Sequence, residues 1–338
     1  MDASIRDVAR RAGVAVGTVS NVLNRPDTVG EGTRERVLAA IAELGFVRNE
    51  SARQLRAGSS RTIGLVVLDV ANPFFTDVAR AVEDVASEHG LAVLLCNSDD
   101  QPAKEAAYLD LLTEQRVQGV VITPTATLSP GLDAVRRRGV PLVLLDRRAP
   151  SADQCSVAVD DELGGRLAAE HLLEGGHRRI AFVGGATALP QLRERQAGVR
   201  TAVGDESLTV LSPAALTVAG GREAAQQLLG IPTGRRPTAV VCANDLLALG
   251  MLQELVRQGC DVPGDVALVG YDDIEFAAAA AVPLTSVRKP RAELGRLAAA
   301  MVLEEASDPG HVHRQLVLEP VLVVRESSSV RSGARRGR

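Results

Sequence analysis

The chain has 338 residues, of which 46% are hydrophobic and 24% charged, a composition typical of a soluble globular protein of about two domains. No apolar run approaches the ~20 residues needed to span a bilayer, and the polar N-terminus lacks the apolar core of a signal peptide, so we expect a cytoplasmic protein. The four cysteines are widely spaced and form no Cys-x-x-Cys pair, which argues against a zinc knuckle or a disulfide framework.

The formal net charge of −4 is unevenly distributed along the chain. The first 61 residues carry ten arginines against seven acidic residues, whereas the remainder carries 28 basic and 35 acidic residues. The only lysines are Lys104 and Lys289. The N-terminal excess of positive charge permits nucleic-acid binding there.

Residues 4–45 are predicted to form three short helices. The first begins at residues 4–7, which resemble a capping box, and ends at Gly13. The second runs from about Val16 to Leu23 and the third from about Thr33 to Leu44, each with apolar residues at helical spacing. Two short helices joined by a glycine-containing turn and followed by a third are typical of a helix-turn-helix, although an ordinary helical bundle or a protein-interaction domain has the same pattern.

A helix-turn-helix presents the small polar side chains of its second helix to DNA. Asn21 is the best candidate for a base contact, because asparagine can bind adenine through two hydrogen bonds. Thr18, Ser20 and Asn24 are candidates for phosphate contacts. The exposed start of this helix adds two further candidates, Gly17 and Val16, and the latter is suited to a thymine methyl group.

Residues 46–60 have the composition of a connector. Residues 49–56 predict two turns of helix that should be marginal alone, and Arg48, Arg53 and Arg56 are suited to phosphate contacts.

From Thr62 onward, short apolar strands alternate with helices, which predicts an α/β fold with buried parallel sheets, either one large sheet or two smaller ones. A tail at 327–338 is expected to be disordered. The predicted strands are Ile63–Leu68, Ala92–Cys96, Val120–Thr123, Leu142–Leu145, Ile180–Val183, Ala239–Cys242 and Val266–Val269, and the predicted helices are Phe74–His89, Ala103–Glu114, Leu163–Glu174 and Leu246–Gln258.

Catalytic and metal-binding motifs are scarce. The sequence has no Gly-x-x-x-x-Gly-Lys-Ser/Thr loop and no Gly-x-Ser-x-Gly elbow. The pair His311-x-His313 could bind a metal on one face of a strand, but no third ligand is identified, and the pair is expected to lie in a surface loop. We therefore expect neither an enzyme nor a bound metal or cofactor.

An ordered series of segments resembles the LacI/GalR family of transcription repressors. It begins with IRDVARRAGVAVGTVSNVLN at residues 5–24 and continues through residues 33–45, NESARQL at 49–55, and shorter matches at 63–64, 72–75, 146–147, 243–245, 270–273 and 283–287. The resemblance covers nearly the whole chain except the last dozen residues. It implies a helix-turn-helix domain over 1–48, a hinge helix and linker over 49–60, and a periplasmic-binding-protein-like effector and dimerisation domain of two subdomains and three crossings over 61–326.

The resemblance also implies how DNA is bound. Ala52 and Leu55 would enter the minor groove, with Leu55 as an apolar wedge that bends the duplex, and two chains of a homodimer would bind a palindromic operator. One departure is Ala15, where the family usually has Ser or Thr as the cap of the recognition helix. The absence of a Ser or Thr cap predicts a less stable or differently anchored recognition helix.

In the same family an effector binds between the two subdomains, near the carboxyl ends of the strands. Each matching carboxylate or amide at a strand end has an alternative role as a helix cap, and each arginine an alternative role in a salt bridge. The basic residues at 288–291 have two interpretations. They bind an anionic effector such as a sugar phosphate, or they are solvated charges at the start of a helix. The implied effector-binding residues are Asn72, Phe74, Asp146, Arg147, Asp160, Arg195, Asn244, Asp272 and Arg291.

We therefore predict a DNA-binding repressor of carbohydrate-utilisation genes that a small sugar releases from its operator. One alternative is a purine-responsive, co-repressed regulator of the same family. The others are a sugar-binding transport protein of the same fold, which residues 4–56 argue against, and a sugar-modifying enzyme.

Overall fold

The computed structural model describes residues 3–46, 60–126, 129–184, 189–308 and 310–329. The chain divides into two compact units, residues 1–60 and 61–338. Each unit is described separately below.

Residues 3–46, the main described part of the first unit, form three α-helices packed on a small core. A capping box holds the start of α1, where Ser4 and Asp7 bond each other's backbone N–H groups, as predicted. The core consists of Val8, Ala9, Ala12, Val19, Val22, Val37 and Ala40. The helices are α1 (Ile5–Ala12), α2 (Val16–Asn24) and α3 (Glu31–Leu44), with a short 3-10 turn, η1 (Pro26–Thr28), between the last two.

The second unit contains two six-stranded sheets, so the prediction of two smaller sheets is confirmed. The first sheet is parallel throughout, with the order β11-β5-β4-β3-β1-β2. Its strands are β1 (Thr62–Val67), β2 (Ala92–Asn97), β3 (Val120–Ile122), β4 (Leu142–Leu145), β5 (Cys155–Val159) and β11 (Gln315–Leu318). Its helices are α5 (Pro73–Glu88), α6 (Pro102–Glu114), α7 (Pro130–Arg137) and α13 (Arg291–Ser307).

The second sheet has the order β12-β10-β9-β8-β6-β7, and only β12 is antiparallel to its neighbour. Its strands are β6 (Ile180–Val183), β7 (Leu208–Leu211), β8 (Ala239–Cys242), β9 (Ala267–Asp272), β10 (Thr285–Arg288) and β12 (Val321–Val323). Its helices are α8 (Asp161–Glu174), α9 (Pro190–Val203), α10 (Val218–Gly230), α11 (Asp245–Arg257) and α12 (Glu275–Ala278), and a 3-10 turn, η2 (Asp205–Ser207), precedes β7.

Helices cover both faces of the first sheet because alternate residues of its strands point to opposite sides. Leu65 and Val143 pack with α5 and α13, whereas Val66 and Leu144 pack with α6 and α7. Both faces are therefore buried, which explains why these strands are nearly continuous apolar runs.

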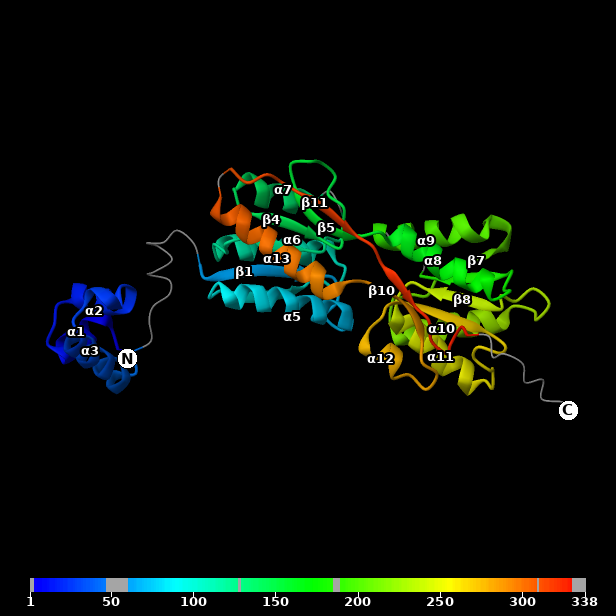
Figure 1. Cartoon of the computed structure of the whole chain (residues 1–338), viewed down its shortest axis with the longest axis horizontal. Coiled ribbons are helices and arrows are strands. Elements are labelled where there is room, and N and C mark those ends of the chain that lie inside the picture. The colour runs from blue at the N-terminus through cyan, green and yellow to red at the C-terminus, as the bar shows by residue number, and fades with distance from the viewer. Residues whose placement is uncertain (1–2, 47–59, 127–128, 185–188, 309, 330–338) are drawn as a thin grey trace. The chain divides into compact units, whose positions relative to one another are not determined.

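Three segments connect the two halves of this unit: β5 to α8, β10 to α13, and β11 to β12. Figure 1 shows the last of these running from one half to the other. Since parallel strands end at a common edge, the strand ends of both sheets are brought to the region where the segments cross.

The sequence missed several elements. Strands β11 and β12 are short edge strands whose exposed and half-buried residues lack a long apolar run, and α9 is rich in arginine and glutamine. The expected start of the disordered tail at residue 327 is also wrong. Ser327 is buried, its carbonyl accepts from Leu268 N–H at 2.8 Å, and its hydroxyl accepts from Thr285 N–H at 2.8 Å. The folded structure continues through Ser329, and 330–338 lie outside the described residues.

Helices α8 and α9 cross with their backbones in close approach. A Cβ atom added at Gly198 would lie 1.9 Å from the carbonyl oxygen of Glu162, and one added at Gly165 would lie 2.0 Å from that of Arg195. Only glycine fits at these two positions without moving a helix. The two glycines thus bring Arg195 of α9 beside the start of α8.

Gly198→Ala is therefore expected to lower the free energy of unfolding by ~1–3 kcal/mol, because the added methyl group forces the two helices apart. Urea unfolding followed by circular dichroism measures this change. The control is Gly230→Ala at the end of α10, where nothing lies within 4 Å of the added Cβ. Equal stability of G198A and the unmodified chain would contradict the packing argument.

Candidate functional site

The second helix of the first unit exposes the side chains that the sequence predicts to contact DNA. Val19 and Val22 are buried, which turns the opposite face of α2 to solvent. Val16, Gly17 and Asn21 are exposed, and Thr18 and Ser20 are half-buried. Ala15 is the N-cap residue and supplies no side-chain hydrogen bond, as expected from its side chain.

The side chain of Asn24 is hydrogen-bonded to Ser20 of its own helix, α2. Its Nδ2 donates to the carbonyl oxygen of Ser20 at 2.8 Å and to Ser20 Oγ at 3.2 Å. A phosphate contact from Asn24 would require these bonds to be exchanged, so Asn21 is the better placed amide. The predicted contacts at Arg48, Ala52, Arg53, Leu55 and Arg56 lie outside the described residues.

In the second unit, a cavity of about 420 Å³ lies where the strand ends of the two sheets face each other. Six of the nine predicted effector-binding residues line it, as does Lys289. The six are Asn72, Phe74, Asp146, Arg195, Asn244 and Asp272.

The first half contributes a buried ion pair over an aromatic ring. Lys289 Nζ lies 2.6 Å from the Asp146 carboxylate, and both side chains are almost wholly buried. The same ammonium group lies 3.9 Å from the centroid of the Phe74 ring. Burial raises the pKa of Asp146, while the charge of Lys289 acts in the opposite direction. Lys289 also belongs to the segment that crosses from β10 to α13, so the pair fixes this crossing to the end of β4.

The second half contributes Arg195 in a fixed orientation. Its Nε donates to Asp161 Oδ1 at 2.8 Å, a terminal nitrogen donates to the carbonyl oxygen of Ala243 at 2.5 Å, and its guanidinium carbon lies 3.8 Å from the centroid of the Tyr271 ring. Burial, the largest single effect, disfavours its charged form, but the negative groups around it, Asp161 foremost, together outweigh burial and raise the pKa of Arg195. The guanidinium is thus a permanent cation held in one orientation at the cavity surface.

One hydrogen bond joins the two halves across the cavity: Asn72 Nδ2 donates to Asp272 Oδ2 at 3.2 Å. Burial raises the pKa of Asp272, and the nearby Arg195 opposes this. Asn72 and Asn244 also act as helix caps, accepting from Phe74 N–H at 3.0 Å and Leu247 N–H at 2.9 Å. Each amide oxygen is therefore used by its cap, while the NH₂ group of Asn72 donates to Asp272 and that of Asn244 donates to the carbonyl oxygen of Leu216 at 3.0 Å.

The cavity lining carries more negative than positive groups. Five aspartates line it, whereas Arg195 and Lys289 are its cations, and both are already paired with carboxylates. Sequence reasoning missed Asp69, Asp99 and Asp100. Their positions just after β1 and β2, at the same sheet edge as Asn72, are the signal that would have found them.

Three predicted residues do not line this cavity. Asp160 caps α8 through Leu163 N–H at 2.9 Å. Arg147 is buried and donates to the carbonyl oxygen of Pro124 at 2.9 Å. Arg291 forms an ion pair with Asp77 at 2.6 Å and donates to the carbonyl oxygen of Asp273 at 2.8 Å, which fixes α13 to its neighbours.

The geometry defines a class of protein: a helical unit with an exposed reading helix, joined to a two-sheet unit with a polar ligand cavity. Among the described residues, no helix is long and apolar enough to cross a membrane. This combination is that of a ligand-controlled, DNA-binding transcriptional regulator.

Comparison with known proteins identifies the family. Residues 4–49 match the bacterial regulatory proteins of the lacI family, and residues 169–328 match the periplasmic binding protein-like domain. The chain is 33% identical to the HTH-type transcriptional repressor PurR of Photobacterium profundum over 330 residues, covering 96% of this chain and 98% of that protein. It is 35% identical to the ribose operon repressor of Escherichia coli K12 over 331 residues, covering 96% and 100%.

A crystal structure of the Lac repressor dimer bound to operator and the anti-inducer ONPF is similar, with a TM-score of 0.83, 28% identity, and coverage of 98% of this chain and 100% of that chain. The chain belongs to the lacI family and is a DNA-binding transcriptional regulator. The curated relatives named above are repressors, not enzymes.

Lys289→Met is expected to lower the free energy of unfolding by ~3–5 kcal/mol, because it leaves the Asp146 carboxylate buried without its cation. Chemical unfolding at neutral pH measures the loss. Lys104→Met is a matched control at the only other lysine, whose ion pair with Asp99 is open to solvent and should contribute little to stability. Adding Asp146→Leu to K289M should recover part of the stability, and its failure to do so would contradict the assignment.

Proposed function

We propose that this protein is a cytoplasmic, homodimeric repressor of carbohydrate-utilisation genes, which binds a palindromic operator and is released by a neutral sugar in the cavity between its two sheets. The observation that carries the proposal is the lining of that cavity. Carboxylates, amides and one fixed guanidinium converge there on a space of about 420 Å³. Such groups donate and accept in pairs, as a polyhydroxylated ligand requires.

The charge of the lining favours a neutral ligand over a sugar phosphate. A phosphate would meet five aspartates, and the two cations that line the cavity already have carboxylate partners. Arg291, which suggested an anionic ligand from the sequence, is paired with Asp77 instead. The ribose operon repressor among the relatives is consistent with a sugar effector.

The Asn72–Asp272 hydrogen bond supports a mechanism of release. It joins the two halves of the cavity where a ligand would bridge them. A sugar that binds both halves more tightly in one relative orientation shifts the population toward that orientation. We propose that this shift separates the hinge segments of the two protomers and so lowers operator affinity. Because the coupling between two binding sites is reciprocal, bound operator lowers sugar affinity by the same free energy.

The test of DNA reading begins with selection of bound duplexes from a random pool by the purified full chain. Recovery of a palindrome is expected. Asn21→Ala should then weaken binding to that palindrome, relative to random DNA, by ~1–3 kcal/mol, because a paired base contact is lost. Ala39→Ser, on the exposed surface of α3, is the control. An unchanged preference in N21A would exclude Asn21 as a base reader.

The test of the effector is a thermal-shift screen of neutral sugars, sugar phosphates and purine bases. A neutral sugar is expected to raise the melting temperature and to weaken operator binding. Asp272→Asn should then bind that sugar at least ~10-fold more weakly, since hydrogen bonds to a charged acceptor are lost, while still binding the operator. Asp84→Asn, on the exposed side of α5, should leave sugar affinity unchanged.

A purine-responsive regulator is the second candidate, favoured by the similarity to PurR. The cavity offers little stacking surface, because Phe74 and Phe75 are its aromatic residues and Lys289 already covers the Phe74 ring. A purine base that raises both the melting temperature and operator affinity in the same screen would establish this candidate and overturn the sugar proposal.

A further inference from the structure

A second group of chemically reactive side chains lies at the amino ends of the strands of the first sheet. This is the edge of the sheet opposite to the carboxyl ends that line the cavity of about 420 Å³. Cys155 begins β5, Glu305 lies in the last turn of α13, and His311 and His313 lie just before β11. One ligand atom from each of these four residues lies within 4.8 Å of the other three. The sequence separates Cys155 from the histidines by more than 150 residues, so the pairing of β5 with β11 brings them together.

The distances fit coordination of one small cation. Cys155 Sγ lies 3.1 Å from His311 Nε2 and 3.6 Å from His313 Nδ1. In a tetrahedral zinc site, with bonds of ~2.3 Å to sulfur and ~2.0 Å to nitrogen, these atoms are about 3.5 Å apart. The two observed separations lie on either side of that value, so these sulfur–nitrogen pairs need shifts of only a few tenths of an ångström, and all four ligand atoms already lie within 4.8 Å of one another.

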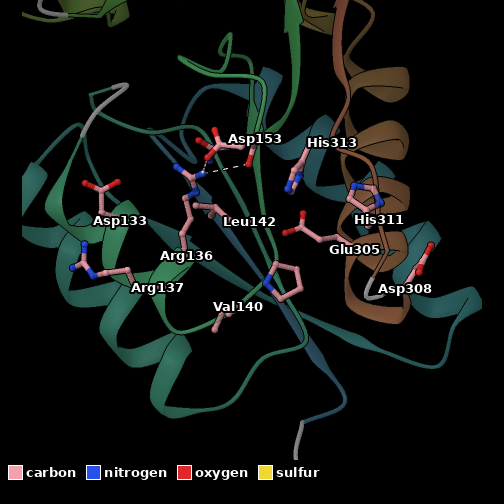
Figure 2. Close-up of a pocket in the computed structure, with 13 residues that line it drawn as sticks. Asp133, Arg136, Arg137, Val140, Leu142, Asp153, Glu305, Asp308, His311 and His313 are labelled. Carbon is pink, nitrogen blue, oxygen red and sulfur yellow. Dashed lines mark hydrogen bonds and ion pairs between the residues drawn. The ribbon is translucent and has the colours of Figure 1, made fainter.

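The carboxylate supplies an independent observation. Glu305 Oε2 is buried, and it has no hydrogen-bond partner among the residues that the structure describes. Figure 2 shows the Glu305 carboxylate beside the His311 and His313 rings. A buried oxygen without a partner is costly, and a cation held by the neighbouring thiolate and imidazoles would satisfy it.

Charged groups around the cluster leave room for such an ion. Arg136, the nearest labelled cation in Figure 2, is turned to Asp153, with 2.5 Å between its terminal nitrogen and Oδ2. Arg314 is paired with Glu304. Glu305 and the two histidines also line a cavity of about 610 Å³, which gives an ion a path from solvent.

We propose that Cys155, Glu305, His311 and His313 bind one Zn²⁺ ion. One thiolate, two imidazoles and one carboxylate are ligands that zinc accepts and that Mg²⁺ and Ca²⁺, which prefer oxygen ligands alone, do not. Four protein ligands leave no open position for a reacting water, so the site is structural or regulatory and not catalytic. The sequence alone does not show this group, because Cys155 is more than 150 residues from the histidines and Glu305 precedes them on a different element, α13.

The ion would connect the three crossing segments. Cys155 is on the strand that leads to α8, Glu305 is on the helix that follows β10, and His313 precedes the strand that leads to β12. Each segment passes from one half of the unit to the other. Zinc would therefore hold together, at one end, the three segments on which any relative movement of the halves depends.

The experiment uses the full chain without a polyhistidine tag, stripped of metal and kept reduced, and titrated with Co²⁺ as a spectroscopic probe. We expect a thiolate-to-cobalt charge-transfer band and the visible bands of tetrahedral Co²⁺, saturating at one ion per chain and displaced by Zn²⁺ but not by Mg²⁺. Cys155→Ser should abolish the charge-transfer band, and Cys260→Ser, at a half-buried cysteine outside the cluster, should retain it. No band in the unmodified chain, or an unchanged band in C155S, would overturn the proposal.

A second set of variants guards against misfolding of the buried Cys155 position. His313→Gln and Glu305→Gln should each lower Zn²⁺ affinity, the former by more than ~100-fold, because loss of a ligand costs more than loss of its supporting contacts. Competition with a chromophoric chelator measures the affinity, and His89→Gln, at an exposed histidine at the end of α5, is the matched control. Zn²⁺ should raise the melting temperature of the unmodified chain and of H89Q but not of H313Q. Equal affinity in H89Q and H313Q would show that the histidines do not form the site.

Discussion

The larger unit depends on a buried ion pair between two residues 143 positions apart. Lys289 and Asp146 are each almost fully removed from water, so each is tolerated only because the other is present. Lys289 lies where the chain crosses from the second sheet to α13, and Asp146 follows β4 of the first sheet. The pair therefore fixes one crossing segment, covers the Phe74 ring and places two charges on the cavity surface at once.

The same long-range logic governs what the sequence can predict. The resemblance to the LacI/GalR family implies that Asn72, Asp146, Asn244 and Asp272 share a site, and the rule that parallel strands end at a common edge agrees with it, because each residue lies at the end of an apolar strand or just after one. That rule is local and needs no knowledge of which strands are neighbours. Their hydrogen-bond and ion-pair partners could not be predicted in this way, because Asn72 meets Asp272 only once the two halves are assembled.

The failures have equally specific causes. Arg147 and Arg291 carry charges that suit a ligand, but buried arginines also satisfy backbone carbonyl groups, and the structure uses them for that purpose. Strands β11 and β12 were missed because edge strands lack the continuous apolar pattern of buried ones. The same omission hid the cluster around Cys155, since β11 is the strand that carries the histidines to β5.

The three crossings make the two halves of the larger unit interdependent in a way that the helical unit is not. The helical core is contained in one continuous stretch, from Val8 to Ala40. By contrast, the edge strand β11 and the covering helix α13 of the first sheet come later in the chain than every strand of the second sheet except β12. A fragment that ends between β5 and α13 leaves the first sheet without its edge strand β11 and with one face partly uncovered, and a fragment that ends between α13 and β11 still lacks the edge strand. The first half therefore cannot be expressed as a contiguous fragment that keeps its core complete and omits the second half, and ribosomal synthesis must be nearly finished before the first half can close.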